Sequence, residues 1–485
     1  MAEAPPSREA PWTFADDIFF QARLRPEQPA VILADRLVTF DMLAQGILRV
    51  EDRIRALGLD PGEIVGVALA SPIRHLIVVA ALFRLGVPSL SAETVESVLA
   101  LRLPVRTYLQ DAGGALTPGI RRTLVHDDWF SGPPRAIAVA PGFAGPDALC
   151  RVDVTSGSTG LPKAISTTVG AFQRRLTIQA EAEPLGVRDR VLSLVRLSGG
   201  WGFRAAAGVV AGGGTLVFAE SAREALQMVA AYRVNACIAS TQQVRDLVRE
   251  QKRAPIPCPS LKALLFGGGL PTRALLTEAR ARLCVVAIVQ YGATEAGPIA
   301  LAPAECLADE EGATGYALPG VAIEIVDDDD RRLPAGAAGV VRVRTPSLGR
   351  AFPPGPDDAH RNLRGGWFYP GDLGRLSEDG MLVLAGRASE VINSGGVKRA
   401  PEVIEEVVLR HPNVAEAAAF GALGADGIEE VNLAIVARAP IAERQLVDWC
   451  GERGVEVARV FTVESLPRTP LGKIRRDELK ATLIG

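Results

Sequence analysis

The chain has 485 residues, of which 48% are hydrophobic and 22% are charged, a composition typical of a globular protein with large cores. A chain of this length is expected to form roughly three domain-sized units. The net charge of −3 and the dispersed basic residues argue against nucleic acid or an anionic membrane surface as a partner.

The cysteines and histidines indicate neither disulfides nor a zinc site. None of the six cysteines forms a C-x-x-C pair and the four histidines are scattered, so we expect buried thiols in a reducing compartment. The N-terminus lacks the apolar core of a secretory signal. The most apolar stretch, residues 63–87, is interrupted by Arg74, His75 and Arg84, which argues against a membrane span. We therefore expect a cytoplasmic protein.

The first part of the chain alternates helical and strand patterns. Residues 39–58 and 71–86 have the apolar spacing of helices, and residues 63–70 and 87–90 are typical of buried strands. The cycle recurs between residues 190 and 283. There we expect strands at 190–195, 213–219, 235–240 and 263–269, and helices at 221–233, 241–251 and 271–283. This alternation predicts a parallel α/β sheet.

The pattern changes after residue 320. Two strands joined by the acidic turn Asp327–Asp330 predict a β-rich subdomain at roughly 315–385. From residue 386 a hairpin, a glycine-bearing loop and a helix that begins at Pro401 predict a small α+β domain. We therefore divide the chain into an N-terminal domain, 1–385, and a C-terminal domain, 386–485.

The loop "TSGSTGLPK", residues 155–163, combines the residue types that bind phosphate. It lies between a predicted strand, 149–154, and a predicted helix, 171–182. Glycines let backbone N–H groups approach an anion, hydroxyls add donors, and Lys163 adds a positive charge. The loop departs from the pattern G-x-x-x-x-G-K-[ST] because Ala164 follows the lysine. Taken alone, it is also compatible with an ordinary surface loop.

Three later stretches also place polar residues beside glycines. In "YGATE", Tyr291 can stack on a base, and Glu295 can hold Mg²⁺ at the carboxyl end of a strand. In "YPGDLG", Asp372 can accept hydrogen bonds from ribose hydroxyls, and Arg387 supplies a fixed charge nearby. Near the end of the chain, Lys473 follows a loop with proline and glycine. Each stretch alone is equally compatible with a structural role.

Together, "TSGSTGLPK", "YGATE", "YPGDLG", "GRASEVINSGGVKRAPEVIE" and "PRTPLGKIRRDEL", in this order, resemble the AMP-forming adenylating enzymes. That superfamily comprises acyl- and aryl-CoA synthetases, adenylation domains and beetle luciferases, and the chain most resembles a stand-alone acyl- or aryl-CoA synthetase. The resemblance implies an α/β fold, with a large N-terminal domain of stacked α/β subdomains, a β-rich subdomain and a small mobile α+β C-terminal domain. It also implies two steps: a carboxylate attacks the α-phosphate of MgATP, giving an acyl-adenylate and pyrophosphate, and a thiol then takes the acyl group.

The resemblance also implies roles for individual residues. The residues that hold the β- and γ-phosphates are Thr155, Ser156, Gly157, Ser158, Thr159, Gly160 and Lys163. The residues around adenine are Gly267, Gly268, Gly269, Tyr291 and Gly292. Thr294 contacts the α-phosphate and Glu295 holds the metal, while Asp372 and Arg387 bind ribose. Lys473 bridges the carboxylate and the α-phosphate, then leaves as the C-terminal domain rotates. The residues expected on the thiol acceptor face are Ser394, Gly395, Gly396 and Lys398.

Two positions depart from the family pattern. Pro370 stands where family members often have threonine before the G-D turn, and Ser389 stands at the expected hinge, where many members carry aspartate. A serine at the hinge is expected to alter the equilibrium between the two domain arrangements, and so to affect two-step turnover more than adenylation.

The stretch expected to line the acyl pocket, residues 195–214, contains no acidic residue. Members that activate α-amino acids use an aspartate there, and burying an unpaired ammonium is costly, so we predict an aryl or medium-sized acyl carboxylate without an α-amine. The predicted pocket residues are Ser198, Gly199, Trp201, Phe203 and Gly297. The alternative for the aromatic members is that they only pack the core.

Coenzyme A is the favoured acceptor because "INSGGVK" resembles the matching loop of CoA synthetases. The alternative acceptor is the phosphopantetheine of an acyl carrier protein supplied in trans. A P-loop kinase or NTPase is disfavoured by Ala164, and a non-catalytic nucleotide-binding module is disfavoured by Glu295 and Lys473. ATP, Mg²⁺ and coenzyme A are thus the expected cofactors, and both a monomer and a homodimer are compatible with the sequence.

Overall fold

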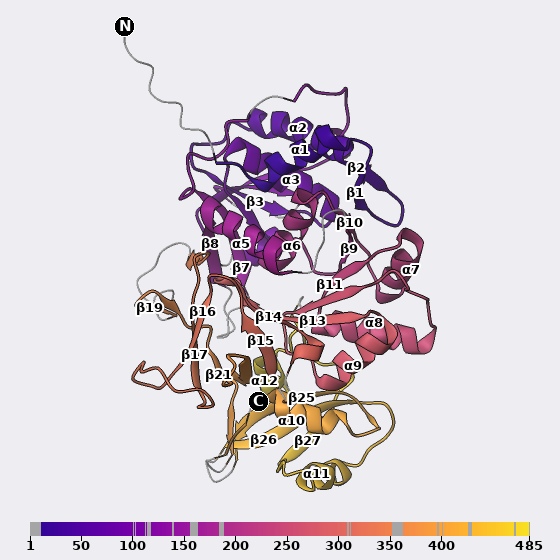
Figure 1. The fold of residues 1–485 in the computed structure, drawn as a ribbon, viewed down its shortest axis with the longest axis vertical. Coiled ribbons are helices and arrows are strands. Elements are labelled where there is room, and N and C mark those ends of the chain that lie inside the picture. The colour runs from indigo at the N-terminus through magenta and orange to yellow at the C-terminus, as the bar shows by residue number, and fades with distance from the viewer. Residues whose placement is uncertain are drawn as a thin grey trace.

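The structure is a computed structural model of the chain. It describes residues 11–99, 101, 103–111, 113, 118–137, 140–155, 163–183, 189–307, 310, 312–351, 362–394, 397–399, 401–424, 429–469 and 472–484. Figure 1 shows the N-terminal helices at one end of the molecule and the C-terminal domain at the other, with the long sheet between them.

The largest sheet has 15 strands and runs through most of the N-terminal domain. Its strands, in spatial order, are β19 (Leu363–Arg364), β20 (Trp367–Phe368), β17 (Gly339–Arg344), β21 (Asp372–Leu376), β22 (Leu382–Arg387), β15 (Ala313–Ala317), β14 (Gly297–Pro303), β13 (Val286–Ala293), β12 (Ala263–Gly267), β11 (Ala236–Ser240), β9 (Arg190–Ser193), β10 (Thr215–Val217), β1 (Pro29–Ile32) and β2 (Leu37–Thr39), and β16 (Ala322–Val326) pairs with β17. The run from β1 to β13 is parallel, and β13 pairs antiparallel with β14. The parallel α/β part of the sheet and the β-rich subdomain therefore meet at β13.

A second sheet of seven strands contains Thr155 and Lys163, the two ends of the "TSGSTGLPK" stretch. Its strands, in spatial order, are β18 (Arg350–Ala351), β8 (Lys163–Thr168), β7 (Leu149–Thr155), β4 (Ser89–Ser91), β3 (Ile64–Ala68), β5 (Val105–Gln110) and β6 (Arg121–Leu124). In the C-terminal domain, β23 (Ile392–Ser394) pairs with β24 (Val397–Arg399), and β25 (Val414–Leu423), β26 (Glu429–Ala437) and β27 (Arg459–Thr462) form a three-stranded sheet.

The helices cover the sheets. The α-helices are α1 (Phe14–Leu24), α2 (Phe40–Ala56), α3 (Pro72–Leu85), α4 (Val95–Leu99), α5 (Val169–Ala182), α6 (Gly200–Ala211), α7 (Ala222–Tyr232), α8 (Thr241–Arg253), α9 (Arg273–Arg282), α10 (Pro401–Leu409), α11 (Glu443–Gly451) and α12 (Arg476–Leu483), and short 3₁₀ turns span Asp127–Trp129 and Ala304–Cys306. Of these helices, α2, α3, α5, α7, α8 and α9 each begin at a serine or threonine side-chain cap. Ser240 caps α8 and Gln243 completes a capping box there, which fixes the end of β11 beside the start of α8.

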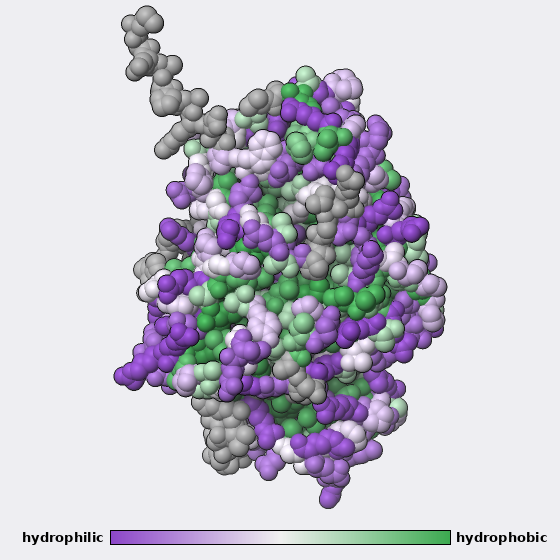
Figure 2. Space-filling view, viewed as in Figure 1, coloured by the Kyte–Doolittle hydropathy of each residue, from purple (hydrophilic) through white to green (hydrophobic). Residues whose placement is uncertain are grey.

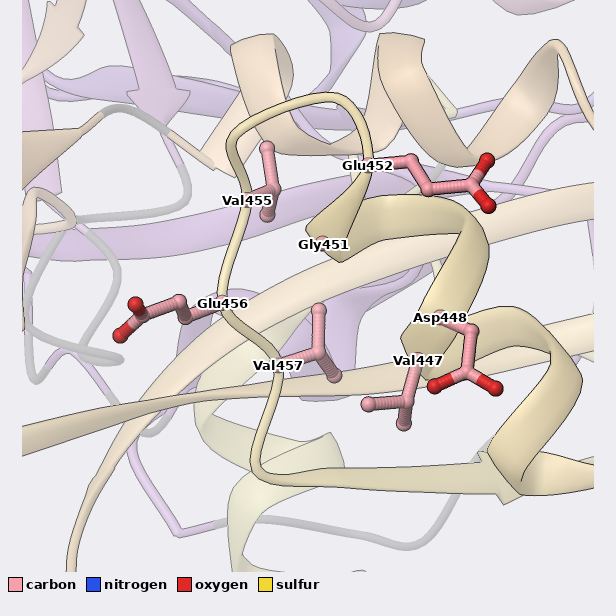
Figure 3. A pocket seen from close by; sticks show the side chains of 7 residues that line it. All are labelled: Val447, Asp448, Gly451, Glu452, Val455, Glu456 and Val457. Carbon is pink, nitrogen blue, oxygen red and sulfur yellow. The ribbon is translucent and has the colours of Figure 1, made fainter.

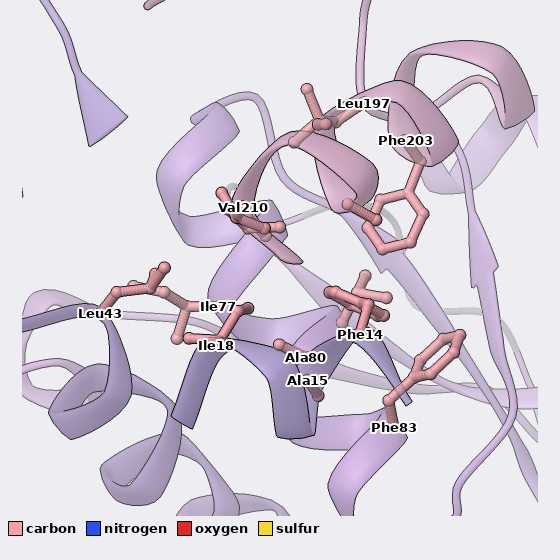
Figure 4. Close-up of a cluster of buried hydrophobic side chains, with 14 of the residues drawn as sticks. Phe14, Ala15, Ile18, Leu43, Ile77, Ala80, Phe83, Leu197, Phe203 and Val210 are labelled. Atoms are coloured by element: carbon pink, nitrogen blue, oxygen red, sulfur yellow. The ribbon is translucent and has the colours of Figure 1, made fainter. Parts of the chain in front are cut away.

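The main core of the N-terminal domain is built around packed aromatic rings. Phe14, Phe83, Phe172 and Phe203 lie with ring centroids 5.0–6.5 Å apart, in edge-to-face and tilted arrangements. Figure 4 shows three of these rings converging from α1, α3 and α6 among buried aliphatic side chains. This core fixes α6, whose first turn reaches the active-site region.

The helices and strands that were predicted from the spacing of hydrophobic residues are confirmed. The helices expected at 39–58, 71–86, 221–233, 241–251 and 271–283 appear as α2, α3, α7, α8 and α9, and the expected strands appear between them. The predicted parallel pairing is confirmed in both cycles, and it is divided between two sheets: the cycle at residues 63–90 belongs to the seven-stranded sheet and the later cycle to the 15-stranded one. The long sheet is also mixed, since β13 and the strands beyond it pair antiparallel.

The surface is mostly polar. In Figure 2 hydrophobic residues gather in a band across the middle of this face, at the height of β13 and β14 in Figure 1. No helix among the described residues has the length and apolar character needed to cross a bilayer.

Gly86, which ends α3, provides a test of the packing between helix and sheet. It has φ +68, and a Cβ atom would overlap the carbonyl oxygen of Gly142. Gly58 has a similar φ of +60, but nothing lies within 4 Å of its Cβ position. We expect Gly58→Ala to lower the free energy of unfolding by about 1–2 kcal/mol, the cost of a left-handed alanine. Gly86→Ala should cost at least about 1 kcal/mol more, because of the overlap. Urea unfolding of the two variants measures this, and equal losses would contradict the packing seen here.

Candidate active site

Three polar side chains meet at the junction of β13, β21 and β22. Tyr291, at the end of β13, donates a hydrogen bond from its hydroxyl to Oδ2 of Asp372. Asp372 and Arg387 are register partners on β21 and β22, and Asp372 Oδ1 lies 3.0 Å from Arg387 Nε. Arg387 Nη1 also donates to the carbonyl oxygen of Pro370, at 2.5 Å. The Arg387 guanidinium is thereby held against the G-D turn.

Burial tunes the protonation of this group. Burial, reinforced by the Asp372 carboxylate, raises the pKa of Tyr291 well above its ordinary value, so the hydroxyl stays a donor. Burial also raises the pKa of Asp372, while Arg387, Tyr291 and Lys473 oppose that shift. Both carboxylate oxygens already have a partner, but a carboxylate has about four acceptor positions. Asp372 therefore retains the capacity to accept further hydrogen bonds from a ligand hydroxyl.

Lys473 reaches the same place from the C-terminal domain. Its ammonium interacts electrostatically with Asp372 and Arg387 of the N-terminal domain and with Glu390 and Glu402 of its own domain. The Lys473 side chain is exposed to solvent, but the protein around its ammonium removes part of the hydration and so lowers the pKa of Lys473. The positive charge of Arg387 lowers this pKa further. The Lys473 ammonium therefore lies near enough to Asp372 and Arg387, about 100 residues earlier in the chain, for their charges to interact.

A buried arginine supports the loop between β13 and β14. Arg175, on α5, is 4% exposed and donates from Nη2 to the carbonyl oxygen of Glu295, at 2.8 Å, and from Nε to that of Ser347, at 3.1 Å. The amide of Gly349 donates to the same Glu295 oxygen at 2.6 Å. Burial lowers the pKa of Arg175 to about 10, which still leaves it charged at neutral pH. These hydrogen bonds fix the backbone of Glu295 and do not involve its side-chain carboxylate, which can therefore bind a ligand.

The carboxylate of Glu295 suits a magnesium ion. No described residue makes a hydrogen bond or ion pair to its side-chain oxygens, and it is only partly buried. Mg²⁺ takes oxygen ligands, is often held by one or two carboxylates, and fills its other positions with water and phosphate oxygens. Within the described part of the chain no cluster of three or more acidic, histidine or cysteine residues could hold a metal by itself. A single carboxylate beside bound phosphates is the arrangement that these residues fit.

Glycines bring the strand ends close to the start of α6. A Cβ atom at Gly267 would lie 2.5 Å from Cη2 of Trp201, and Gly268, with φ +75, would bring one to 3.9 Å from the same ring. The carbonyl oxygen of Gly269 accepts a hydrogen bond from Thr241 Oγ1 at 2.7 Å. The indole of Trp201, a predicted acyl-pocket residue, therefore covers the end of β12, where Gly267 and Gly268 are expected to lie beside adenine.

Gly200, the first residue of α6, also lies in a crowded position. A Cβ there would lie 2.9 Å from Asp153 Oδ2 and 3.4 Å from the methyl group of Thr294. Asp153 is 2% exposed and pairs with Arg151, whose Nε lies 2.7 Å from Asp153 Oδ1. The guanidinium of Arg151 in turn lies 4.1 Å from the ring centroid of Phe203. A buried ion pair thus underlies the first turn of α6 beside Thr294.

The remaining predicted residues fall into three groups. Ser156, Gly157, Ser158, Thr159, Gly160, Gly395 and Gly396 lie outside the described residues, as do the side chains of Thr155 and Lys398. Lys163 begins β8, and Ser394 ends β23 opposite Val397. Ser198 and Gly199 lie just before α6, and Gly292 and Gly297 flank the turn of the "YGATE" loop.

Phe203 is placed differently from the prediction. It is fully buried in the aromatic core, so its ring offers no surface to a ligand, in line with the alternative that it packs the core. Gly297 has φ +74, and a Cβ atom added to it would lie 3.0–3.2 Å from side-chain atoms of Arg175. It therefore leaves room for Arg175 and does not face an open pocket there.

The sequence reasoning missed Arg175, Arg151 and Asp153. The sequence pattern that could have indicated them is a charged residue among apolar ones: Arg175 lies on the buried side of α5, and Arg151 and Asp153 alternate with apolar residues on β7.

A hollow on the C-terminal domain, shown in Figure 3, lies beside α11. It is lined by Val447, Asp448, Gly451, Glu452, Val455, Glu456 and Val457. None of the predicted site residues lines it.

The chain matches two protein-family models and several known enzymes. The model of the AMP-binding enzyme family matches residues 18–352, and that of the AMP-binding enzyme C-terminal domain matches residues 403–473. A 2-succinylbenzoate–CoA ligase of Bacillus licheniformis is 28% identical, over 95% of this chain and 98% of the relative. A fatty acid–[acyl-carrier-protein] ligase of Streptomyces coeruleorubidus is 29% identical, over 96% of each.

A solved structure is also similar. The o-succinylbenzoate coenzyme A synthetase of Bacillus subtilis in complex with ATP and a magnesium ion has a TM-score of 0.84, with 26% identity over 96% of this chain and 99% of that one. The expected fold, a large N-terminal and a small C-terminal domain, is confirmed by this likeness. Because the family model covers well over half of the chain, the protein belongs to the family of AMP-binding enzymes.

Proposed function

We propose that the protein is an AMP-forming acid–thiol ligase that activates a carboxylic acid with ATP and transfers the acyl group to coenzyme A. The observation that carries the proposal is the position of Lys473, whose ammonium interacts electrostatically with Asp372 and Arg387, while Asp372 accepts the hydroxyl hydrogen bond of Tyr291. A cation close to residues suited to bind ribose can neutralise the charge that builds up when a carboxylate attacks the α-phosphate of ATP. The CoA ligases among the relatives support the same reaction.

The chemistry of the first step is mainly one of positioning and charge. Carboxylate oxygen is a weak nucleophile and is repelled by the triphosphate. A cation placed between them orients the carboxylate toward the α-phosphate and neutralises part of the negative charge. Lys473 has this role in the proposal, Thr294 contacts the α-phosphate, and Asp372 with Arg387 holds the ribose. No general base is needed, because the acid already carries its negative charge. Bound to Glu295, Mg²⁺ would neutralise charge on the phosphate oxygens.

The proposed substrate is a small carboxylic acid without an α-amine. The first turn of α6 contains no acidic side chain, and the nearby carboxylate of Asp153 is already paired with Arg151. An ammonium group would therefore be buried without a partner. The side chain of Trp201 supplies a flat apolar face at the end of β12, which favours an aryl or medium-sized acyl group.

A second acceptor has support from one relative. The Streptomyces ligase, which loads a carrier protein by its name, is as similar to this chain as the CoA ligases are. Coenzyme A remains the preferred acceptor because several relatives are CoA ligases by name, among them the 2-succinylbenzoate–CoA ligases of two Bacillus species.

The acid should be identified by ATP–pyrophosphate exchange with a panel of aryl, aliphatic and α-amino acids. We expect exchange with acids that lack an α-amine and none with their α-amino counterparts. Thioester formation with CoA should follow for the acids that exchange. Exchange without a CoA thioester, but with loading of a phosphopantetheinylated carrier protein, would replace CoA by the carrier as acceptor. Absence of exchange with every acid would overturn the proposal.

Removing the Lys473 ammonium should separate the two half-reactions. We expect Lys473→Ala to slow acyl-adenylate formation on the order of 10²–10³-fold, the effect of losing one charged donor at a developing negative charge. Thioester formation from supplied acyl-adenylate should be unaffected. Lys480→Ala, on the exposed side of α12, is the matched control. Equal loss in both half-reactions would show that Lys473 does not act at the phosphate.

The lowered pKa of Lys473 predicts a pH dependence. The ammonium must be charged to act, so adenylation should decline as pH rises through this pKa, starting below the ordinary lysine range. Lys473→Arg retains a cation at every accessible pH, and its adenylation rate should lack that decline. Pre-steady-state acyl-adenylate formation between neutral and alkaline pH measures both profiles. The same alkaline decline in the arginine variant would assign it to another group.

A further inference from the structure

The loop that carries Lys473 is closed by its own hydrogen bonds. The amide of Thr469 donates to the carbonyl oxygen of Lys473 at 2.7 Å, and the amide of Lys473 donates back to Thr469 Oγ1 at 3.2 Å. Arg468 Nη1 donates to the carbonyl oxygen of Gly472 at 2.7 Å. We call this unit, residues 468–469 and 472–474, the lysine hairpin. Because it is internally braced, the place where it docks decides where the ammonium of Lys473 lies.

The lysine hairpin docks on α8 of the N-terminal domain. Gly472 has φ +81, and a Cβ there would lie 2.6 Å from Cβ of Gln242 and 3.9 Å from Oγ of Ser240. The backbone of the hairpin is therefore in close contact with the first turn of α8. Such a contact fixes distance but supplies little attraction of its own, so other groups must favour the docked position.

Glu416, on β25 of the C-terminal domain, links the hairpin to α8. Its Oε2 lies 2.7 Å from Nη2 of Arg468, and its Oε1 lies 3.9 Å from Nη2 of Arg249, two turns along α8 from Gln242. Glu416 and Arg468 are 20% exposed at their side chains, whereas Arg249 is 57% exposed. One carboxylate thus joins the arginine that braces the hairpin to an arginine of the other domain.

Docking also brings like charges together. Arg245 lies between Gln242 and Arg249 on α8, and its Nη1 donates to Gln242 Oε1 at 3.0 Å. Burial lowers the pKa of Arg245, Arg468 lowers it further, and Glu416 is the first of the carboxylates that oppose the shift, before Asp246 and Glu405. Without Glu416, the docked hairpin would place Arg468 against two α8 guanidiniums with less compensation.

We propose that Glu416 is a positioning residue for the adenylation step, holding the lysine hairpin on α8 through Arg468 and Arg249. The proposal rests on the proposed function, in which Lys473 acts only in adenylation. The cross-domain contact is long and partly exposed, so it is weak enough to be released when the C-terminal domain moves. Glu416 therefore favours one domain arrangement and does not lock it.

The half-reactions test this role. We expect Glu416→Gln to reduce acyl-adenylate formation by about tenfold, the effect of losing a charge-assisted hydrogen bond, and to leave thioester formation from supplied acyl-adenylate unchanged. Glu406→Gln is the matched control, because Glu406 pairs with Arg410 inside the C-terminal domain, at 3.1 Å. Equal loss in both half-reactions of Glu416→Gln would indicate a merely structural role and overturn the proposal, as would no loss in either.

A double-mutant cycle tests the partner. Arg249→Ala should slow adenylation in the same direction, by about two- to fivefold for a partly exposed pair. Combined with Glu416→Gln it should add nothing further, because both variants remove the same link. Arg249→Glu should be worse than Arg249→Ala, since it places two carboxylates opposite each other. Additive losses would show that Glu416 does not act through Arg249.

A measurement independent of activity separates this inference from the proposed function. Spin labels on Arg253→Cys and Glu452→Cys, at side chains 81% and 73% exposed in the two domains, report their separation in a Cys306→Ser background. We expect Glu416→Gln to shift or broaden the distance distribution of the free protein, and Glu406→Gln to leave it unchanged. An unaltered distribution in Glu416→Gln would overturn the positioning role even in an active ligase. A shifted distribution in a chain without pyrophosphate exchange would instead contradict the proposed function alone.

Discussion

The group formed by Tyr291, Asp372 and Arg387 is the constraint on which the site depends. It lies where the parallel part of the long sheet turns antiparallel, so it joins β13 to the β-rich strands β21 and β22. A buried carboxylate is costly unless its oxygens are satisfied, and here a hydroxyl and a guanidinium satisfy it. The charges of Asp372 and Arg387 also act on the ammonium of Lys473. The Asp372–Arg387 pair at the junction of the subdomains therefore also influences where the Lys473 ammonium lies.

Buried charge is used in the same way on the other side of the site. Arg175 holds the carbonyl oxygen of Glu295, and the Arg151–Asp153 pair lies beneath Gly200 and beside Thr294. Both groups are buried, Arg175 hydrogen-bonds the backbone of Glu295, and Asp153 lies against the Cβ position of Gly200, as the methyl group of Thr294 does. Charged groups in a core hold their partners at narrow geometries, because leaving either partner unpaired is expensive. Rigid support from α5 and β7 thus leaves Thr294 and Glu295 pre-arranged.

Sequence periodicity predicted the elements well and their assembly poorly. The helices α2, α3, α7, α8 and α9 have strong apolar spacing and caps, so local physics was enough to find them. Which sheet a strand joins depends on long-range pairing, such as that of β1 with β10, and no local pattern encodes it. For the site, the motifs indicated Tyr291, Asp372, Arg387 and Lys473, which the structure brings together. Phe203 and Arg175 could not be assigned, because an aromatic or a charge on a helix does not reveal whether it faces a pocket or a core.

The docked position of the lysine hairpin shows how the two domains share one site. Its steric part, Gly472 against Gln242, sets how closely the hairpin approaches α8, while its electrostatic part, Glu416 between Arg468 and Arg249, favours that approach. The steric term is short-ranged and vanishes once the domains separate by a few ångströms. The charges act over a longer distance but are screened by salt at the exposed end. A contact built from these two terms can be specific when formed and cheap to break, which is what an enzyme needs if one cation must enter and leave the same site in each turnover.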